Sequence, residues 1–192
     1  MTAQISDTIK FDGKDYNIAG VKGNGLFNPH EHGLSVEMIS TACWRGYYCS
    51  YKVNNEELYL QDVSVGLDED NKRLLAKKSG PYLFGKLPKH NKEAWCYDFL
   101  DLNWKVPFNG GILAGLGFVR ELYVHMGFHP AWKYRSVVEL IFEEGVLLET
   151  LDRSTEMASI RERTTKDDLK PSSMNKEEVM NWIRDCFSLE YE

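Results

Sequence analysis

Apolar and polar side chains alternate with a period of two through most of residues 8–151, and this pattern limits the chain to a strand-rich fold. Turn residues separate the alternating segments, and Asp12-Gly13 is a dipeptide typical of a two-residue hairpin turn. The predicted strands are residues 8–11, 16–19, 42–53, 58–67, 81–87, 95–104, 112–126, 136–142 and 146–151. About eight short strands before one helix predict an α+β fold, mainly antiparallel, that forms a barrel or a sandwich.

Residues 112–126 fit two patterns. As a strand, their even-numbered positions form one apolar face that only Arg120 interrupts, and as a helix they also present an apolar stripe. Gly115 and Gly117 are unfavourable inside a helix and are typical of a bent or bulged strand. We therefore predict a strand here.

The 192 residues are predicted to form one globular domain, with a β-rich body over residues 1–151 and a C-terminal helix over 173–188. The polar residues 152–172 between them are expected to be a linker or a short surface helix. Asn175 is the predicted N-cap of the C-terminal helix, and Glu178 stands where a capping box needs it. The apolar stripe of this helix consists of Val179, Trp182, Ile183, Cys186 and Phe187. We expect this stripe to pack on the outside or the open end of the sheet.

The chain is predicted to be cytoplasmic. Residues 1–12 carry charges at Asp7, Lys10 and Asp12 and have no apolar core of the kind that an export signal needs. The longest stretch without a polar side chain, residues 110–119, is about half of what a membrane-spanning helix requires, so no membrane association is expected. The four cysteines include no C-x-x-C pair, and in this compartment we expect four free thiols.

Short motifs for catalysis or phosphate binding do not occur. The glycine-rich residues 109–117 suggest a dinucleotide site, but Arg120 stands where the third glycine of that fingerprint belongs. No P-loop and no Gly-x-Ser-x-Gly nucleophile elbow is present. We expect no cofactor, and the balance of these features favours a protein that is not an enzyme.

Four histidines are the only candidates for a metal site. His30 and His32 would point to the same side of an extended segment, and His125 and His129 lie four residues apart. If the loop with His30 folds over the end of the strand at His125, a zinc site of three or four nitrogen ligands becomes possible. This arrangement would suit a metal-dependent hydrolase.

The net charge of −6 is a sum of two unlike parts. Residues 71–93 contain seven Lys or Arg and one Glu, a net charge of +6, so the rest of the chain carries −12. Residues 139–192 hold fourteen acidic and seven basic side chains. Because the whole is acidic, nucleic acid is not expected as a partner, whereas a basic protein is.

The first functional hypothesis is a non-enzymatic binding protein, for example of the immunity or inhibitor type, that docks a basic protein. Residues 42–53 carry large side chains on both faces, so the face with Trp44 and Tyr48 is either covered by the C-terminal helix or free for binding. The candidate binding residues are Trp44, Arg45, Tyr48, Tyr59, Glu139, Glu143 and Glu144. The alternatives are a β-barrel carrier of a small apolar ligand and the metal-dependent hydrolase.

Overall fold

The structure, a computed structural model, describes residues 2–164 and 175–191. Its strands are β1 (Thr8–Phe11), β2 (Lys14–Asn24), β3 (Tyr47–Asn54), β4 (Glu57–Val65), β5 (Lys89–Asn91), β6 (Cys96–Phe99), β7 (Trp104–Lys105), β8 (Asn109–Phe118), β9 (Tyr134–Glu143) and β10 (Val146–Asp152). The α-helices in the described residues are α1 (Glu69–Ala76), α2 (Ser154–Arg163) and α3 (Lys176–Cys186). None of these helices is both long and apolar enough to cross a membrane.

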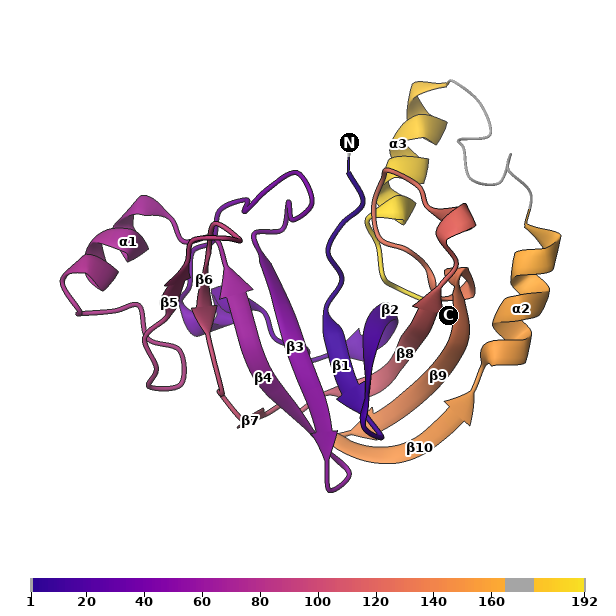
Figure 1. The fold of residues 1–192 in the computed structure, drawn as a ribbon, viewed down its shortest axis with the longest axis horizontal. Helices are drawn as coiled ribbons and strands as arrows, with labels where there is room; N and C mark the ends of the chain where they lie inside the picture. Colours follow the sequence, from indigo (N-terminus) through magenta and orange to yellow (C-terminus); the bar gives the residue numbers. More distant parts are fainter. Residues whose placement is uncertain (1, 165–174, 192) are drawn as a thin grey trace.

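The ten strands form one sheet in the order β10-β9-β8-β2-β1-β3-β4-β6-β5, with β7 beside β4 (Figure 1). The pairing of β1 with β3 is parallel and the other pairings between named strands are antiparallel. A further pairing of β10 with β4, at Val146 and Glu57, closes the sheet in a ring. The predicted α+β class, mainly antiparallel with a helix near the C-terminus, is confirmed, although the ring is not a barrel.

The main core fills the inside of this ring. Ile9, Tyr51 and Leu60 are completely or almost completely buried, and they come from β1, β3 and β4. Ile112 and Leu140 meet them from β8 and β9 on the opposite side. Period-two alternation places these side chains on one face of each strand, which is why the sequence pattern was informative.

A second, smaller apolar cluster covers the outer face of β8 and β9. Leu113 lies between the inward-facing Ile112 and Ala114, so its side chain points outward. There it packs with Val137 of β9 and Met157 of α2. Both faces of β8 are covered, which explains why its sequence is almost continuously apolar. Leu113 and Met157 of the outer cluster also line the candidate site.

The hairpin at Asp12-Gly13 is confirmed, since both residues have a positive φ and Phe11 pairs with Lys14. The strand predicted for residues 112–126 is wrong beyond Phe118. Gly117 adopts a φ of +72°, and the chain then leaves the sheet through a short 3₁₀ helix, Arg120–Leu122.

Three other predicted strands also differ. In place of residues 95–104 the chain forms the two short strands β6 and β7, separated by residues 100–103. In place of residues 42–53, β3 begins at Tyr47, because residues 43–46 make a turn in which Gly46 has a φ of +81°. Residues 81–87 form only an isolated bridge between Leu83 and Lys86.

The helices differ from the sequence prediction at α1. Of the residues predicted to be a linker or a short surface helix, 154–163 form the helix α2, and 165–172 lie outside the described residues. The polar helix α1 was not predicted, although the side chain of Asp68 caps it by accepting a hydrogen bond from the Asn71 amide at 2.8 Å. The helix predicted from Asn175 onward is confirmed as α3, with the Asn175 side chain accepting from the Glu177 amide.

Candidate ligand-binding site

A pocket of about 680 Å³ lies on the outside of the ring, over the second apolar cluster. Its floor is formed by Leu113 of β8 and Glu139 of β9, and α2 forms one wall. Residues 124–133 and the C-terminal segment 182–191 form the other walls. In Figure 1 these are the elements around α2 and the lower end of α3.

The C-terminal segment is held to the body by backbone hydrogen bonds. The Val21 amide donates to the Leu189 carbonyl at 2.6 Å, and the Phe128 amide donates to the Cys186 carbonyl at 2.7 Å. Gly111 lets Tyr191 approach the sheet, because a Cβ at this position would lie 2.2 Å from the Tyr191 hydroxyl oxygen. These contacts make the last turn of α3 and the residues after it a fixed part of the pocket.

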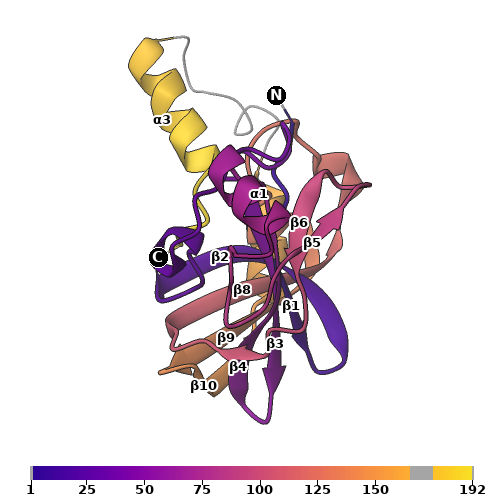
Figure 2. The ribbon, with the colours of Figure 1, turned by 90° about the vertical axis from the view of Figure 1, so that its left-hand side faces the viewer.

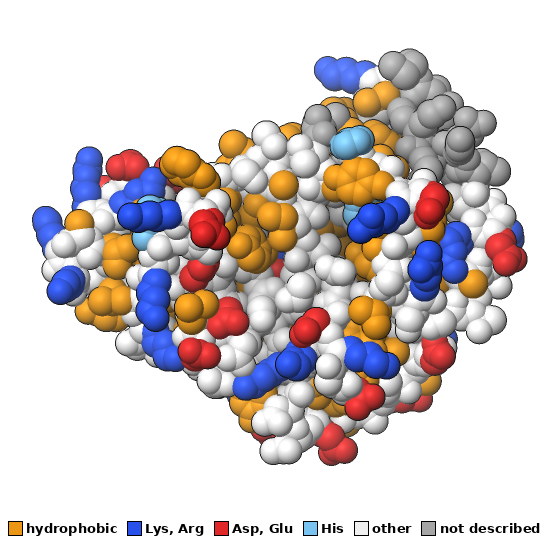
Figure 3. Space-filling model, in the orientation of Figure 1, with side chains coloured by type: hydrophobic (Ala, Val, Ile, Leu, Met, Phe, Trp, Pro, Cys, Tyr) orange, Lys and Arg blue, Asp and Glu red, His pale blue; other side chains and the backbone are white. Residues whose placement is uncertain are grey.

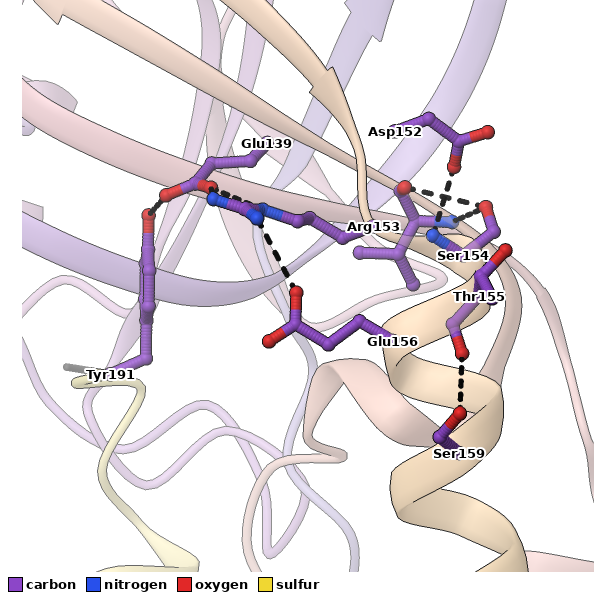
Figure 4. Close-up of polar contacts among 9 residues, drawn as sticks. Glu139, Asp152, Arg153, Ser154, Thr155, Glu156, Ser159 and Tyr191 are labelled. Carbon is purple, nitrogen blue, oxygen red and sulfur yellow. Dashed lines mark hydrogen bonds and ion pairs between the residues drawn. The ribbon is translucent and has the colours of Figure 1, made fainter.

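One side of the pocket is polar and is organised around Glu139 (Figure 4). Oε2 of Glu139 accepts a hydrogen bond from Nε of Arg153 at 2.7 Å and lies 2.6 Å from its Nη2. The Tyr191 hydroxyl donates to Oε1 of Glu139 at 2.7 Å. Nη1 of Arg153 also lies 3.4 Å from Oε2 of Glu156 on α2, so the guanidinium lies between two carboxylates.

These contacts set the protonation states of the cluster. Burial acts to raise the pKa of Glu139, but the hydrogen bonds from Tyr191 and Arg153 outweigh it and lower the pKa. Burial, together with the neighbouring Glu139 carboxylate, raises the pKa of Tyr191. At neutral pH Glu139 is therefore an anion that accepts a hydrogen bond from a neutral phenol.

Lys133, at the end of the short 3₁₀ helix Ala131–Lys133, lines the same pocket. The residue is only 4% exposed, and burial lowers the pKa of its ammonium group. The ammonium nitrogen lies 5.3 Å from the centre of the Trp132 ring. It makes no ion pair or hydrogen bond with any side chain or carbonyl in residues 2–164 and 175–191.

The remainder of the lining is mainly apolar. Met157 and Ile160 contribute from α2, Trp132 from the 3₁₀ helix, and Trp182 from α3. Trp182 and Cys186 belong to the apolar stripe predicted from the sequence, so part of that stripe faces the pocket. A pocket of this volume, apolar with a few polar groups on its walls, has the properties of a site for a small molecule.

Of the seven predicted binding residues, Trp44 lies close to the C-terminal segment, and Arg45 contacts the N-terminal segment. Trp44 stacks on Phe187 with ring centres 5.3 Å apart and remains 46% exposed. Arg45 pairs with Asp7, whose carboxylate also accepts a hydrogen bond from the Cys49 amide at 2.6 Å. The Arg45 side chain therefore ties the N-terminal segment to β3.

The other predicted binding residues are spread over the molecule. Tyr48 lies against Cys96, and the Tyr59 hydroxyl donates to Glu57 at 2.6 Å. Glu143 and Glu144 are exposed where β9 turns into β10, and Glu144 accepts a hydrogen bond from Asn109 at 2.8 Å. Of the seven, only Glu139 lines the pocket.

The four histidines are in two separate aromatic surroundings. His32 lies among the rings of Phe27, Phe84 and Trp104, at 5.0–5.3 Å between centres, and His30 is on the same 3₁₀ helix, Pro29–His32. His125 and His129 both contact Tyr123. In the part of the chain that the structure describes, no three His, Cys, Asp or Glu side chains lie together as metal ligands. These histidines therefore do not form the zinc site that the sequence left possible.

His129 is neutral at physiological pH. Burial, with a smaller effect of nearby Lys133, lowers the pKa of its imidazole to about 4. Its two ring nitrogens are buried and have no hydrogen-bond partner within the described ranges. The imidazole ring packs on the ring of Phe118, with 4.6 Å between the ring centres, as an apolar side chain would.

The lysine-rich residues 71–93 lie at one end of the molecule. Figure 3 shows Lys and Arg side chains gathered over α1 and β5 on the left of that view. Two of them are paired within α1, since Lys72 contacts Glu69 and Arg73 contacts Asp70. This basic end is formed by elements that do not line the pocket.

Comparison with known proteins supplies no relative: no family model matches the chain, and neither a curated protein nor a solved structure matches it. The site residues that the sequence did not reveal are Lys133, Arg153, Met157, Trp182 and Tyr191 as members of one pocket. They come from separate segments of the chain and follow no short motif. The one available signal was the apolar stripe of the C-terminal helix, which requires an apolar partner.

Proposed function

We propose that the protein is a non-enzymatic binding protein whose ligand is a small, largely apolar molecule held in the pocket between β8, β9, α2 and α3. The observation that carries this proposal is a pocket of about 680 Å³ that combines apolar walls with a few fixed polar groups. The cluster of Glu139, Arg153 and Tyr191 is held by hydrogen bonds before a ligand arrives, which lowers the ordering cost of binding.

In this proposal the ligand lies on the outer face of the ring, whereas a β-barrel carrier would hold its ligand inside. The inside of the ring is filled with buried side chains such as Tyr51, Phe99 and Phe108. The pocket on the outer face has both the volume and the lining that a ligand needs. The four free thiols support action in a reducing compartment such as the cytoplasm.

Docking of a basic protein stays a prediction. Exposed carboxylates at Glu143, Glu144 and Glu149, around the β9–β10 hairpin, support it. Glu139 and Arg45 do not, because each is engaged in an internal ion pair. A partner would then contact the hairpin rather than the full set of predicted residues.

Nile red, an uncharged apolar dye, provides a direct test of the pocket. Binding at one site is expected to increase its fluorescence, with energy transfer from Trp132 and Trp182 in the pocket wall. Ile160→Trp adds bulk to the wall and is expected to weaken dye binding by about tenfold or more. Ser159→Trp adds the same side chain to an exposed position on α2 and is the matched control.

Equal dye affinity in wild type, Ile160→Trp and Ser159→Trp would contradict the proposal, provided that thermal melts show all three to be folded. The proposal also fails if wild type binds neither Nile red nor any of decanoate, decanol and decyltrimethylammonium.

A further inference from the structure

The unpaired ammonium of Lys133 distinguishes the pocket from an ordinary apolar cavity. The other side chains that bring a positive charge to buried or half-buried positions near the site have partners. Arg153 pairs with Glu139, and Arg161 donates hydrogen bonds to the carbonyls of Trp132 and Tyr134 at 2.7 and 2.8 Å. Lys133 is 4% exposed and, among the described residues, its ammonium makes no ion pair or hydrogen bond and lies 5.3 Å from the centre of the Trp132 ring.

A buried charge without a counter-ion is unfavourable, because the interior solvates it poorly. Burial accordingly lowers the pKa of Lys133, and neighbouring His129 is neutral and supplies no negative charge. The thiol of Cys186 is close enough to interact electrostatically with Lys133, but burial raises the pKa of that thiol, so it too is neutral at pH 7. An anionic group in the pocket would provide the missing counter-ion.

We propose that the pocket selects small amphipathic monoanions, whose single anionic group lies against Lys133 while the apolar part packs on Met157, Ile160 and Trp182. This inference rests on the proposed function, since it names the chemical class of the ligand for the same site. Lys133 and the apolar wall belong to one continuous pocket.

The acidic side chains of the pocket explain why one negative charge is preferred to several. Glu156, Asp185 and Glu190 line it as well, and all three are exposed at its edge. None of them makes an ion pair with Lys133. They would repel a second or third negative charge, so a nucleotide or a polyphosphate is disfavoured.

Three compounds with the same ten-carbon chain and different head groups test the inference: decanoate, decanol and decyltrimethylammonium. Each is titrated, below its micelle-forming concentration, as a competitor of Nile red at pH 7. Wild type is expected to bind decanoate about tenfold or more tightly than decanol, because a hydrogen bond to a charged group exceeds one between neutral groups. Decyltrimethylammonium is expected to bind least.

Lys133→Met keeps the length and the apolar character of the side chain and removes the charge. It is expected to lose the preference for decanoate and to leave the affinity for decanol within about twofold. Lys133→Arg is expected to retain a preference for decanoate. Lys14→Met, a charge deletion at the exposed first residue of β2, is the matched control and is expected to behave as wild type.

The outcomes separate this inference from the proposed function. Equal affinities of wild type for decanoate and decanol, or a preference for decanoate that survives in Lys133→Met, would overturn the inference while pocket binding stands. Failure of Nile red and of all three competitors to bind would remove both. Equal affinities of wild type for decanoate and decanol would overturn the inference even if Lys133→Met does not fold.

Discussion

At the scale of single residues, Glu139 connects three parts of the chain. Its carboxylate joins β9 to Arg153, at the junction of β10 and α2, and to Tyr191 near the C-terminus. The side chain is nearly buried, so its two partners take the place of the water that would otherwise solvate it. Loss of its charge would leave Arg153 without its closest counter-ion.

Glu139→Gln is expected to lower the free energy of unfolding at pH 7 by about 1–2 kcal/mol, since the amide still accepts from Tyr191 but no longer pairs with Arg153. The pKa of Glu139 is lowered in the folded protein, so its stabilising effect is complete above the unfolded value of about 4.3. The effect is lost as the pH falls through the folded value. Urea melts at pH 7 and pH 3 should show a smaller difference from wild type at pH 3 than at pH 7.

Glu149→Gln, an exposed carboxylate on β10, serves as the control and should match wild type at both pH values. A destabilisation by Glu139→Gln that is as large at pH 3 as at pH 7 would show that packing, and not charge, holds this residue.

The role of a single residue was the least predictable property of this chain. Glu139 was expected in a docking surface because residues 139–192 are acidic. Its partners lie 14 and 52 residues further along the chain, and no local pattern indicates pairs at such separations. Lys133 has no distinguishing sequence context either, because its isolation depends on which carboxylates the fold brings near.

At the scale of elements, α3 differs from the other segments that form the pocket in how it is attached to the sheet. Its C-terminal end is fixed through Cys186 and Phe187, while its first turns extend away from the sheet (Figure 2). None of its residues is fully buried. In contrast, β8 is hydrogen-bonded to β2 on one side and β9 on the other.

Backbone amides of α3 are therefore expected to exchange with deuterium much faster than those of β8. Decanoate at saturation should slow exchange around Trp182 and Cys186, because both line the pocket, and should leave α1 unchanged. Mass spectrometry of peptic peptides with and without decanoate checks both statements. Equal protection of α3 and β8 in the free protein would contradict this view of the helix.

Helices and strands could be predicted from the sequence where a single physical cause determines them. Most strands followed from the alternation of side chains, and α3 from its cap at Asn175 and its apolar stripe. The end of β8 was missed because apolar side chains continue beyond Phe118, although there they cover the outer face as part of a loop. The helix α1 is short and polar, so it gave no periodic signal.

At the scale of the whole molecule, the ring depends on a close contact at the β9–β10 turn. The Gly145 amide donates to the Phe108 carbonyl at 2.9 Å, and the Gly145 carbonyl accepts from the Leu58 amide at 2.8 Å. Gly145 has a φ of +76°, and a Cβ there would lie 2.0 Å from the Val106 carbonyl oxygen. Glycine is thus required at this position for both its conformation and its size.

Gly145→Ala is expected to lower the melting temperature substantially more than Gly13→Ala. Gly13 has a similar φ of +71° but open space around it, so its substitution costs only the backbone strain of about 1–2 kcal/mol. A steric clash is added at Gly145, and each further 1 kcal/mol corresponds to about 2–4 °C for a chain of this size. Calorimetry of the two variants measures the difference, and equal melting temperatures would show that the closure at β4 and β10 is dispensable.

The closed ring also has a consequence for how the chain is made. Partners at Val146 and Glu57 are far apart in the sequence, and so are the partners Val21 and Ile112 of β2 and β8. A ribosome adds roughly 5–20 residues per second, so β4 and β2 emerge several seconds before the strands that complete their side of the ring. During that interval the side chains of the future interior, from Ile9 to Leu60, face an unfinished sheet with open edges. The nascent chain is consequently most exposed to aggregation just before β8 to β10 are synthesised.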